Sequence, residues 1–140
     1  MKYFLAKTDP ESYSVDQFEA EHRTIWDGVR NAQALRAIRE MHAGDRVFIY
    51  HSLKGDAGIV GLAKVVSEPR ADSTDPKLTV VEFEFLTRLD PATTLKEIKA
   101  SGLFNDWALV RQSRLSTMLA PDAFVGWMRA KHGSLHFPEV

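Results

Sequence analysis

The sequence predicts a single α+β domain over residues 1–140, in which a strongly curved sheet or small barrel carries short helices at its rim. Short apolar runs with strand character are interrupted by short helices, without the regular strand–helix alternation of a parallel sheet. Two capping boxes mark helix starts, and no repeat, low-complexity tract or linker divides the 140 residues. A doubly wound parallel sheet is the less favoured alternative.

The first part of the chain is predicted to form one strand and two helices. Residues 3–7 are apolar and aromatic, which favours a strand. Residues 14–17 match a capping box, so a short helix should run to about Glu21. A second helix, over residues 31–41, has one apolar face and begins at Asn31, whose side chain is well suited to cap it.

The middle of the chain is predicted to form a hairpin and a further strand. Residues 46–51 and 58–66 are rich in β-branched and apolar side chains, and the segment between them is polar and contains glycine. Residues 68–76 are rich in Pro, Asp and Ser, which is typical of a loop. Apolar and acidic residues then alternate over residues 81–85, which indicates a half-buried strand continuing toward Leu89.

The last third is predicted to contain two helices separated by an ambiguous segment. A capping box begins at Thr94, and the helix that follows it should end at Gly102. The pattern of residues 109–119 is compatible with a segment that is partly loop and partly strand. Pro121 then opens a final helix that should close near His132.

Charge and composition exclude several classes of protein. With 18 basic and 19 acidic residues the net charge is −1, so the chain has no overall attraction for a nucleic-acid backbone. It contains no cysteine, which excludes thiolate chemistry and suits a reducing compartment. The apolar run at the amino end is too short for a signal peptide or a membrane span, so we expect a cytoplasmic protein without membrane contact.

Patterns that resemble phosphate or metal sites are weak. Gly55, Gly58 and Gly61 are evenly spaced, but no Gly-Lys-Ser/Thr follows, so they fit a hairpin turn and close strand packing rather than a phosphate loop. His132 and His136 have the spacing of metal ligands on a helix, yet the glycine between them favours a frayed tail.

The pair His51-Ser52 places a base beside a hydroxyl, which raises the question of hydrolysis. Neighbouring residues on a strand point to opposite faces, and the sequence has no nucleophile elbow and no obvious orienting acid. We therefore expect no catalytic residue, no metal and no cofactor, and rank hydrolysis below binding.

Aromatic and polar residues at the ends of the predicted elements form the candidate binding site. Its members are Trp26, Asn31, Tyr50, His51, Ser52 and the run 110–116. Together they offer flat faces and edge-reading groups, which the recognition of a single nucleobase needs. Asp27 and Gly28 should shape a turn, and Arg30 should either contact phosphate or brace the loop against Asp27.

Four motifs, in this order and spacing, resemble the EVE domain family. They are Trp26-Asp27-Gly28-Val29-Arg30-Asn31, Tyr50-His51-Ser52, Gly58-Ile59-Val60-Gly61-Leu62-Ala63 and Arg114-Leu115-Ser116. The resemblance spans Tyr3 to about Met128, and its specificity lies in the joint occurrence of the motifs. EVE domains are similar to the PUA and YTH folds, so the resemblance implies a small β-barrel of about five or six mostly antiparallel strands, flanked by short helices.

The resemblance also implies a non-enzymatic reader of a modified base, either cytosine or adenine in DNA or a modified base in RNA. The base would enter an aromatic-polar pocket, with Trp26 and Tyr50 as walls. Asn31, His51 and Ser52 would be the polar groups that read its edge.

Further residues match family motifs by their place in the chain. Lys7 and Thr8 stand where the family has its first-strand Lys-Ser motif, and Ser116 belongs to the late motif, so all three are implied as pocket residues. Leu78 stands near where many members carry a tryptophan, which implies a shallower pocket or a different ligand. The implied phosphate contacts are Arg30, Arg111 and Arg114.

The implied partner is nucleic acid that carries a modified base, with a nuclease or an RNA-modification protein as a further candidate. Three other functions stay open: an RNA-binding accessory module, a hydrolase that uses His51, and a pocket for a small metabolite. The first predicts a preference for RNA that depends on the sugar 2′-hydroxyl. The sequence leaves the oligomeric state open.

Overall fold

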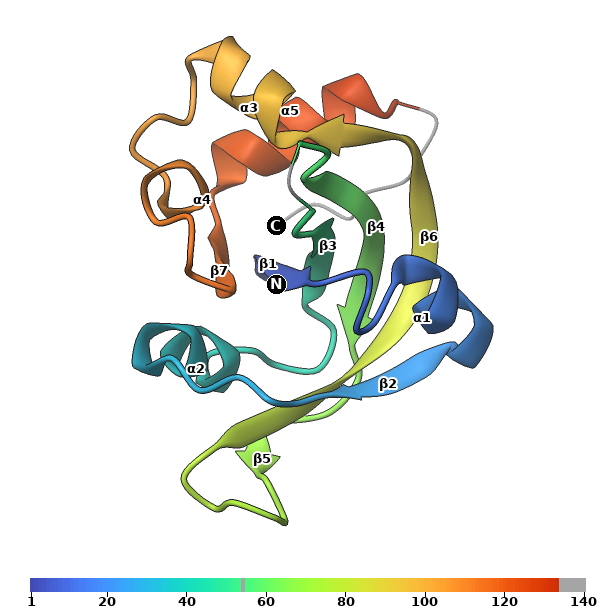
Figure 1. Ribbon diagram of the computed structural model, residues 1–140, viewed down its shortest axis with the longest axis vertical. Coiled ribbons are helices and arrows are strands. Elements are labelled where there is room, and N and C mark those ends of the chain that lie inside the picture. The colour runs from blue at the N-terminus through green and yellow to red at the C-terminus, as the bar shows by residue number, and fades with distance from the viewer. Residues whose placement is uncertain (54, 134–140) are drawn as a thin grey trace.

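The computed structural model describes residues 1–53 and 55–133, which form strands and short helices (Figure 1). The strands are β1 Tyr3–Thr8, β2 Arg23–Trp26, β3 Arg46–His51, β4 Gly58–Val65, β5 Arg70–Ala71, β6 Thr79–Thr94 and β7 Thr117–Ala120. The helices are α1 Val15–Glu21, α2 Ala32–Arg39, α3 Leu95–Ser101, α4 Ala108–Arg111 and α5 Asp122–Lys131. The predicted α+β class is confirmed. No helix in this part of the chain is long and apolar enough to cross a membrane.

The strands form a curled sheet in the order β2-β6-β4-β3-β1-β7, with β5 paired to β6 beside that path. β1 lies between β3, to which it is parallel, and β7, to which it is antiparallel. The other strand pairs of the described residues are antiparallel. The predicted predominance of antiparallel pairing is confirmed, and the doubly wound alternative is wrong.

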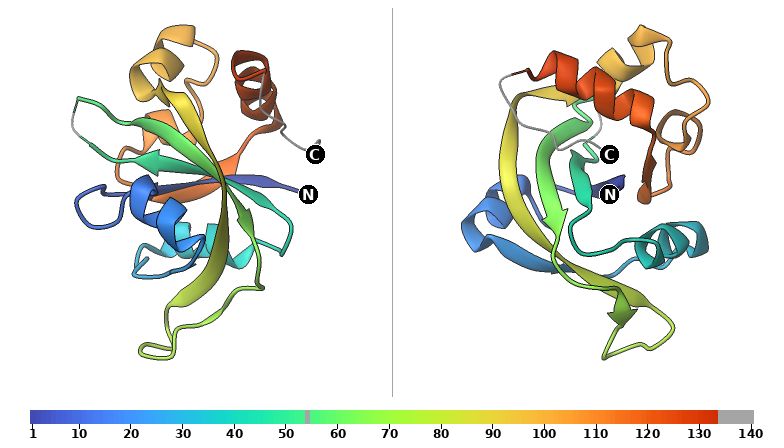
Figure 2. Two further views of the ribbon diagram at one scale, coloured as in Figure 1. Left: turned by 90° about the vertical axis from the view of Figure 1, so that its right-hand side faces the viewer. Right: turned by 180° about the vertical axis from the view of Figure 1, so that it is seen from behind.

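The long strand β6 makes the sheet curl (Figures 1 and 2). It spans 16 residues and pairs with β2 near its start and with β4 farther along. Register shifts interrupt its ladder with β4, and such irregularities bend a strand and increase its twist. In the described chain β2 and β7 end the sheet and do not pair with each other, so the sheet is strongly curved, as predicted, but not a closed barrel.

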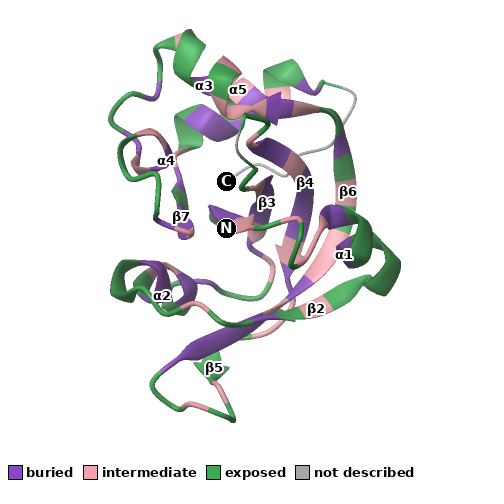
Figure 3. Ribbon diagram, viewed as in Figure 1, coloured by how far each residue is buried: buried purple, intermediate pink, exposed green. Residues whose placement is uncertain are grey.

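Apolar clusters cover both faces of β1. Successive side chains of a strand point to opposite faces. Tyr3 and Leu5 accordingly lie in one cluster, while Phe4 and Ala6 lie in the other, and each is at most 1% exposed. Figure 3 shows the buried central strands and the exposed outer sides of the helices. Burial on both faces explains why β1 is continuously apolar in sequence.

Helix starts agree with the capping chemistry of the sequence. The Ser14 hydroxyl accepts from the Gln17 backbone N–H at 3.2 Å, and the Gln17 side chain accepts from the Ser14 N–H at 2.8 Å. Thr94 and Glu97 form the same reciprocal pair at the start of α3. α3 ends at Gly102, whose φ of 69° is left-handed. Both predicted capping boxes are confirmed.

Three segments hold more regular structure than the sequence predicts. The stretch before the Trp26 turn forms β2, and the loop after residue 68 contains the short strand β5. The ambiguous segment 109–119 holds part of α4 and the start of β7. The described sheet consequently has seven strands rather than five or six.

Gly58→Ala is expected to lower the free energy of unfolding by about 1–3 kcal/mol, measured by urea unfolding. A Cβ at Gly58 would lie 2.7 Å from the Thr93 carbonyl oxygen and 2.9 Å from Thr94 Cα, and neither backbone atom can rotate away. Gly126→Ala, in α5, is the control, because nothing lies within 4 Å of its added Cβ and alanine favours a helix over glycine. Equal stability changes in the two variants would contradict close packing of β4 on β6.

Candidate functional site

A pocket opens where the end of β1, the end of α1 and the end of β2 meet. Its volume is about 520 Å³, within the range of about 300–1,000 Å³ that is usual for small-ligand sites. The lining residues are Lys7, Thr8, Asp9, Tyr13, Glu21, residues 24–30 and Ser116. The pocket thus brings together five of the predicted site residues, namely Lys7, Thr8, Trp26, Arg30 and Ser116.

Aromatic rings form the inner side of this pocket. Trp26 is only 8% exposed, and its ring centroid lies 5.1 Å from that of Phe83 and 6.4 Å from that of Phe18. Tyr13 meets Trp26 nearly edge-on, at 6.2 Å and an interplanar angle of 80°. Trp26 is therefore a core residue with a small surface in the pocket, rather than the exposed stacking face that its motif implies.

Lys7 brings a positive charge to the pocket. Its ammonium donates to the Ser113 carbonyl oxygen at 3.0 Å and lies 5.3 Å from the centroid of the Tyr50 ring. Burial lowers the pKa of the Lys7 ammonium from its ordinary value. The Lys7 backbone N–H donates to the Ser116 carbonyl oxygen at 2.7 Å, which holds the late motif beside β1.

Tyr13 and Glu21 form a polar pair on the pocket wall that the sequence did not single out. The Tyr13 hydroxyl donates to Glu21 Oε1 at 2.5 Å. Burial, as the larger cause, and the hydrogen bond to Glu21 raise the pKa of Tyr13 to about 12, so the phenol stays protonated at neutral pH. The Thr8 hydroxyl donates to the Tyr13 carbonyl oxygen at 2.7 Å and fixes this loop to β1.

The turn after Trp26 forms the outer lip of the pocket. Gly28 has a φ of 75°, which confirms the predicted need for glycine in this turn. Arg30 lies 3.9 Å from Asp75 in the loop before β6, so the predicted brace against Asp27 is wrong. The arginine is exposed and reaches across to a different loop.

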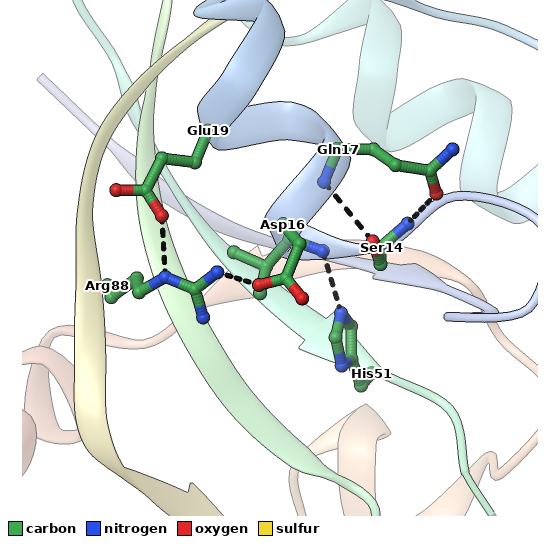
Figure 4. A network of polar contacts seen from close by, with 7 residues as sticks. Ser14, Asp16, Gln17, Glu19, His51 and Arg88 are labelled. Atoms are coloured by element: carbon green, nitrogen blue, oxygen red, sulfur yellow. Dashed lines mark hydrogen bonds and ion pairs between the residues drawn. The ribbon is translucent and has the colours of Figure 1, made fainter.

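Tyr50, His51 and Ser52 do not line the pocket. Tyr50 is 3% exposed and packs in the core beneath Lys7. His51 Nε2 accepts from the Val15 backbone N–H at 3.0 Å, at the start of α1 (Figure 4). The Ser52 backbone N–H donates to the Thr8 carbonyl oxygen. Their expected contact with a base in this pocket is not supported, because Tyr50 lies in the core, His51 bonds to α1, and Ser52 lies exposed beyond the end of β3.

The hydrogen bond to α1 also determines what His51 can do chemically. Because Nε2 accepts from a backbone N–H, this nitrogen carries no proton and the ring is neutral. Burial lowers the pKa of His51, which favours the same neutral form. A general base needs a free ring nitrogen, so this contact argues against the hydrolytic alternative.

Asn31 and the late arginines border a second, smaller hollow of about 320 Å³. Asn31 Oδ1 accepts from the N–H groups of Gln33 and Ala34, so the predicted helix cap is confirmed and this oxygen is not available to a base. Arg111 lies 3.1 Å from Asp106, and Arg114 is exposed on the same rim. Asn31 and the two arginines are thus placed outside the Trp26 pocket.

Leu78 and His132 lie away from the pocket. Leu78 lines a separate hollow beside the end of α2 and β5. His132 is 8% exposed and pairs with the Thr93 hydroxyl at 2.7 Å, so the expected frayed tail is wrong at this residue. His136 lies outside the described residues. Within the described ranges no group of three or more His, Cys, Asp or Glu side chains could hold a metal ion.

Lowering the pH from 7.5 to 5.5 is expected to reduce the free energy of unfolding. Burial lowers the pKa values of His51 and His132 below the ordinary 6.5, so the unfolded chain takes up protons first. The stability that these groups contribute is complete above pH 6.5 and is lost as the pH falls toward the folded values, by at most about 1.4 kcal/mol per pH unit per histidine. Urea unfolding at several pH values measures this slope.

His51→Gln tests the contribution of His51 to that slope. The variant should show a smaller loss of stability between pH 7.5 and 5.5 than the wild type. His22→Gln, which removes an exposed histidine, is the control and should keep the wild-type slope. An unchanged slope in His51→Gln would contradict the burial of a neutral His51.

The curled sheet with short helices at its rim defines a protein of the PUA-like class. The EVE domain model matches residues 2–129, and the chain belongs to the EVE domain family. The predicted family membership is confirmed.

Three relatives show how far the similarity extends. Thymocyte nuclear protein 1 of Rattus norvegicus is 33% identical over 124 residues, which cover 69% of this chain and 55% of that protein, so the chain spans about half of its length. The structure of Rpa0253 from Rhodopseudomonas palustris has a TM-score of 0.88 at 33% identity. The matched region covers 98% of this chain and 97% of the Rpa0253 chain. The human THYN1 protein, solved in complex with 5-methylcytosine-containing DNA, has a TM-score of 0.82 at 25% identity. The matched region covers 99% of this chain and the whole of the THYN1 chain in that structure.

A more distant match concerns the fold alone. The YTH domain of Mmi1 is 15% identical, with a TM-score of 0.56. The matched region covers 96% of this chain and 91% of the Mmi1 chain. It supports the PUA-like and YTH-like architecture that the resemblance implies.

Proposed function

We propose that this protein is a non-enzymatic module that binds a modified cytosine of DNA, with the base turned out of the helix into the Trp26 pocket. The observation that carries the proposal is the pocket itself, which gathers Lys7, Thr8, Trp26 and Ser116 from separate parts of the chain. The human THYN1 protein, whose structure matches 99% of this chain with a TM-score of 0.82, has been solved with 5-methylcytosine-containing DNA. A pocket of about 520 Å³ has room for a single base.

The composition of the pocket suits a flat, partly apolar ligand. Trp26, Ile25 and Val29 give it apolar surface, on which a base and its methyl group can rest. Trp26 offers only the small part of its ring that the core leaves exposed, so these three side chains supply the apolar contact together, and burial of such surface contributes about 25 cal/mol per Å². Binding therefore requires no large basic surface, in agreement with the net charge of −1.

We propose that positive groups near the pocket contact the flanking phosphates. Arg30 lies on the lip, and Arg114 lies on the rim of the neighbouring hollow. The Lys7 ammonium bonds to Ser113 of that same rim, so it links the two hollows. We propose that the strand runs across this rim while the base occupies the pocket.

The alternatives carry less support. The contact between His51 and α1 disfavours hydrolysis. Binding of RNA, a nuclease or RNA-modification partner, and the cytoplasmic location stay predictions. A preference for RNA of the same sequence over DNA would favour the RNA-binding alternative.

The proposal predicts that labelled single-stranded DNA with one 5-methylcytosine binds about tenfold more tightly than the same strand with plain cytosine. One methyl group in an apolar pocket supplies a discrimination of this order. Fluorescence anisotropy at fixed salt measures both affinities, with RNA of the same sequence and N6-methyladenine DNA as comparisons. Equal binding of all strands, or none at all, would overturn the proposal.

A further inference from the structure

The charges of the Trp26 pocket are acidic on balance. Three carboxylates, from Asp9, Glu21 and Asp27, line it against two cations, Lys7 and Arg30. A phosphate group would meet net repulsion there. Hydrogen-bond donors are the favoured ligand groups, since an ionised carboxylate can only accept.

Among the three carboxylates, Glu21 is the one held in place by a pocket side chain. The Tyr13 hydroxyl donates to Oε1 at 2.5 Å. Among the described residues Oε2 has no hydrogen-bond partner, so this oxygen can accept from a ligand. Tyr13 is itself held, because its ring packs against Trp26 and its carbonyl oxygen accepts from Thr8. The acceptor atom therefore has a defined position beside the aromatic inner side of the pocket.

We propose that Glu21 reads the exocyclic amino group of the bound base, so that the pocket accepts amino bases and rejects oxo bases. This inference rests on the proposed function and names its substrate class more closely. Carboxylates accept from the N4 amino group of cytosine, whereas the O4 atom of thymine is an acceptor and would face the carboxylate unpaired. Tyr13 acts as a positioning residue, since it holds Glu21 and does not itself read the base.

The need for such a group follows from the chemistry of the two methylated pyrimidines. Thymine and 5-methylcytosine carry the same 5-methyl group on the same ring and differ at the 4-substituent and at N3. Apolar contacts of Trp26, Ile25 and Val29 cannot separate them. A pocket that selects 5-methylcytosine in DNA must therefore reject thymine through a polar contact, and Glu21 supplies an acceptor of the required kind.

The test compares matched single-stranded oligonucleotides that carry 5-methylcytosine or thymine at one position. Wild-type protein is expected to bind the 5-methylcytosine strand at least about tenfold more tightly, as for a hydrogen bond to a charged group. Glu21→Gln should erase or reverse this ratio, because an amide can present either an acceptor or a donor. Tyr13→Phe should reduce the ratio, since Glu21 is then no longer held.

Controls separate this inference from a general loss of fold or charge. Glu11→Gln removes the same charge from an exposed position that does not line the pocket, and it should keep the wild-type ratio. A tenfold ratio retained in Glu21→Gln, or equal wild-type binding of both strands, would overturn the role of Glu21. In either case, tighter binding of 5-methylcytosine than of cytosine would leave the proposed function standing. Absence of binding to every strand would overturn both.

Discussion

Trp26→Ala is expected to lower the free energy of unfolding by about 3–5 kcal/mol, the cost of removing a large aromatic side chain from a core. The ring is 8% exposed and packs against Phe83, Phe18 and Tyr13. Domains are usually stable by only about 5–15 kcal/mol, so this loss is a large fraction of the total. Urea unfolding followed by circular dichroism measures it.

Two further variants separate the structural and binding roles of this tryptophan. Trp127→Ala is the control, because Trp127 is only half-buried, and its loss of stability should be smaller. Trp26→Phe keeps an aromatic ring and should fold, while binding 5-methylcytosine DNA more weakly than the wild type. A Trp26→Ala protein as stable as the wild type would contradict the burial of this ring.

Lys7→Met is expected to weaken binding of 5-methylcytosine DNA by about 10- to 100-fold with little loss of stability. Lys7 lines the pocket, and its ammonium, held by Ser113 and the Tyr50 ring, can donate to the base. A hydrogen bond from a charged donor contributes about 1.5–3 kcal/mol. The fold should tolerate methionine, because burial already disfavours the charged form of Lys7 and lowers its pKa.

Anisotropy at two salt concentrations distinguishes a local contact from bulk attraction. Lys96→Met removes the same charge from the exposed side of α3. It should change the affinity by less than about threefold, because salt screens an exposed charge that does not line the pocket. If both variants lost affinity equally, Lys7 would have no specific contact with the ligand.

Local chemistry made most of the fold predictable. Capping boxes located α1 and α3, and the alternation of apolar residues located β6. β2 was not predicted, because it is a four-residue strand at the sheet end with one buried side chain, so it has no marked apolar pattern. The parallel pairing of β1 with β3 depends on contacts between distant segments, which no local pattern reports.

The site was only partly predictable, because a motif identifies residues but not the directions of their side chains. Lys7, Trp26 and Ser116 meet in one pocket. Tyr50 belongs to a contiguous motif, yet its strand places it under Lys7 in the core. Tyr13 and Glu21 were missed since they stand eight positions apart, and the intervening helix alone brings them together. An aromatic residue just before a capping box was their one local signal.

The most direct test of base binding in the Trp26 pocket is an intermolecular NMR measurement. The DNA strand would carry a ¹³C-labelled methyl group on its single 5-methylcytosine. We predict nuclear Overhauser contacts from this methyl group to protons of Trp26, Ile25 or Val29, with an upfield shift on binding from the aromatic rings. Contacts of the methyl group only with residues outside the pocket, such as Leu103 or Trp107, would contradict the account.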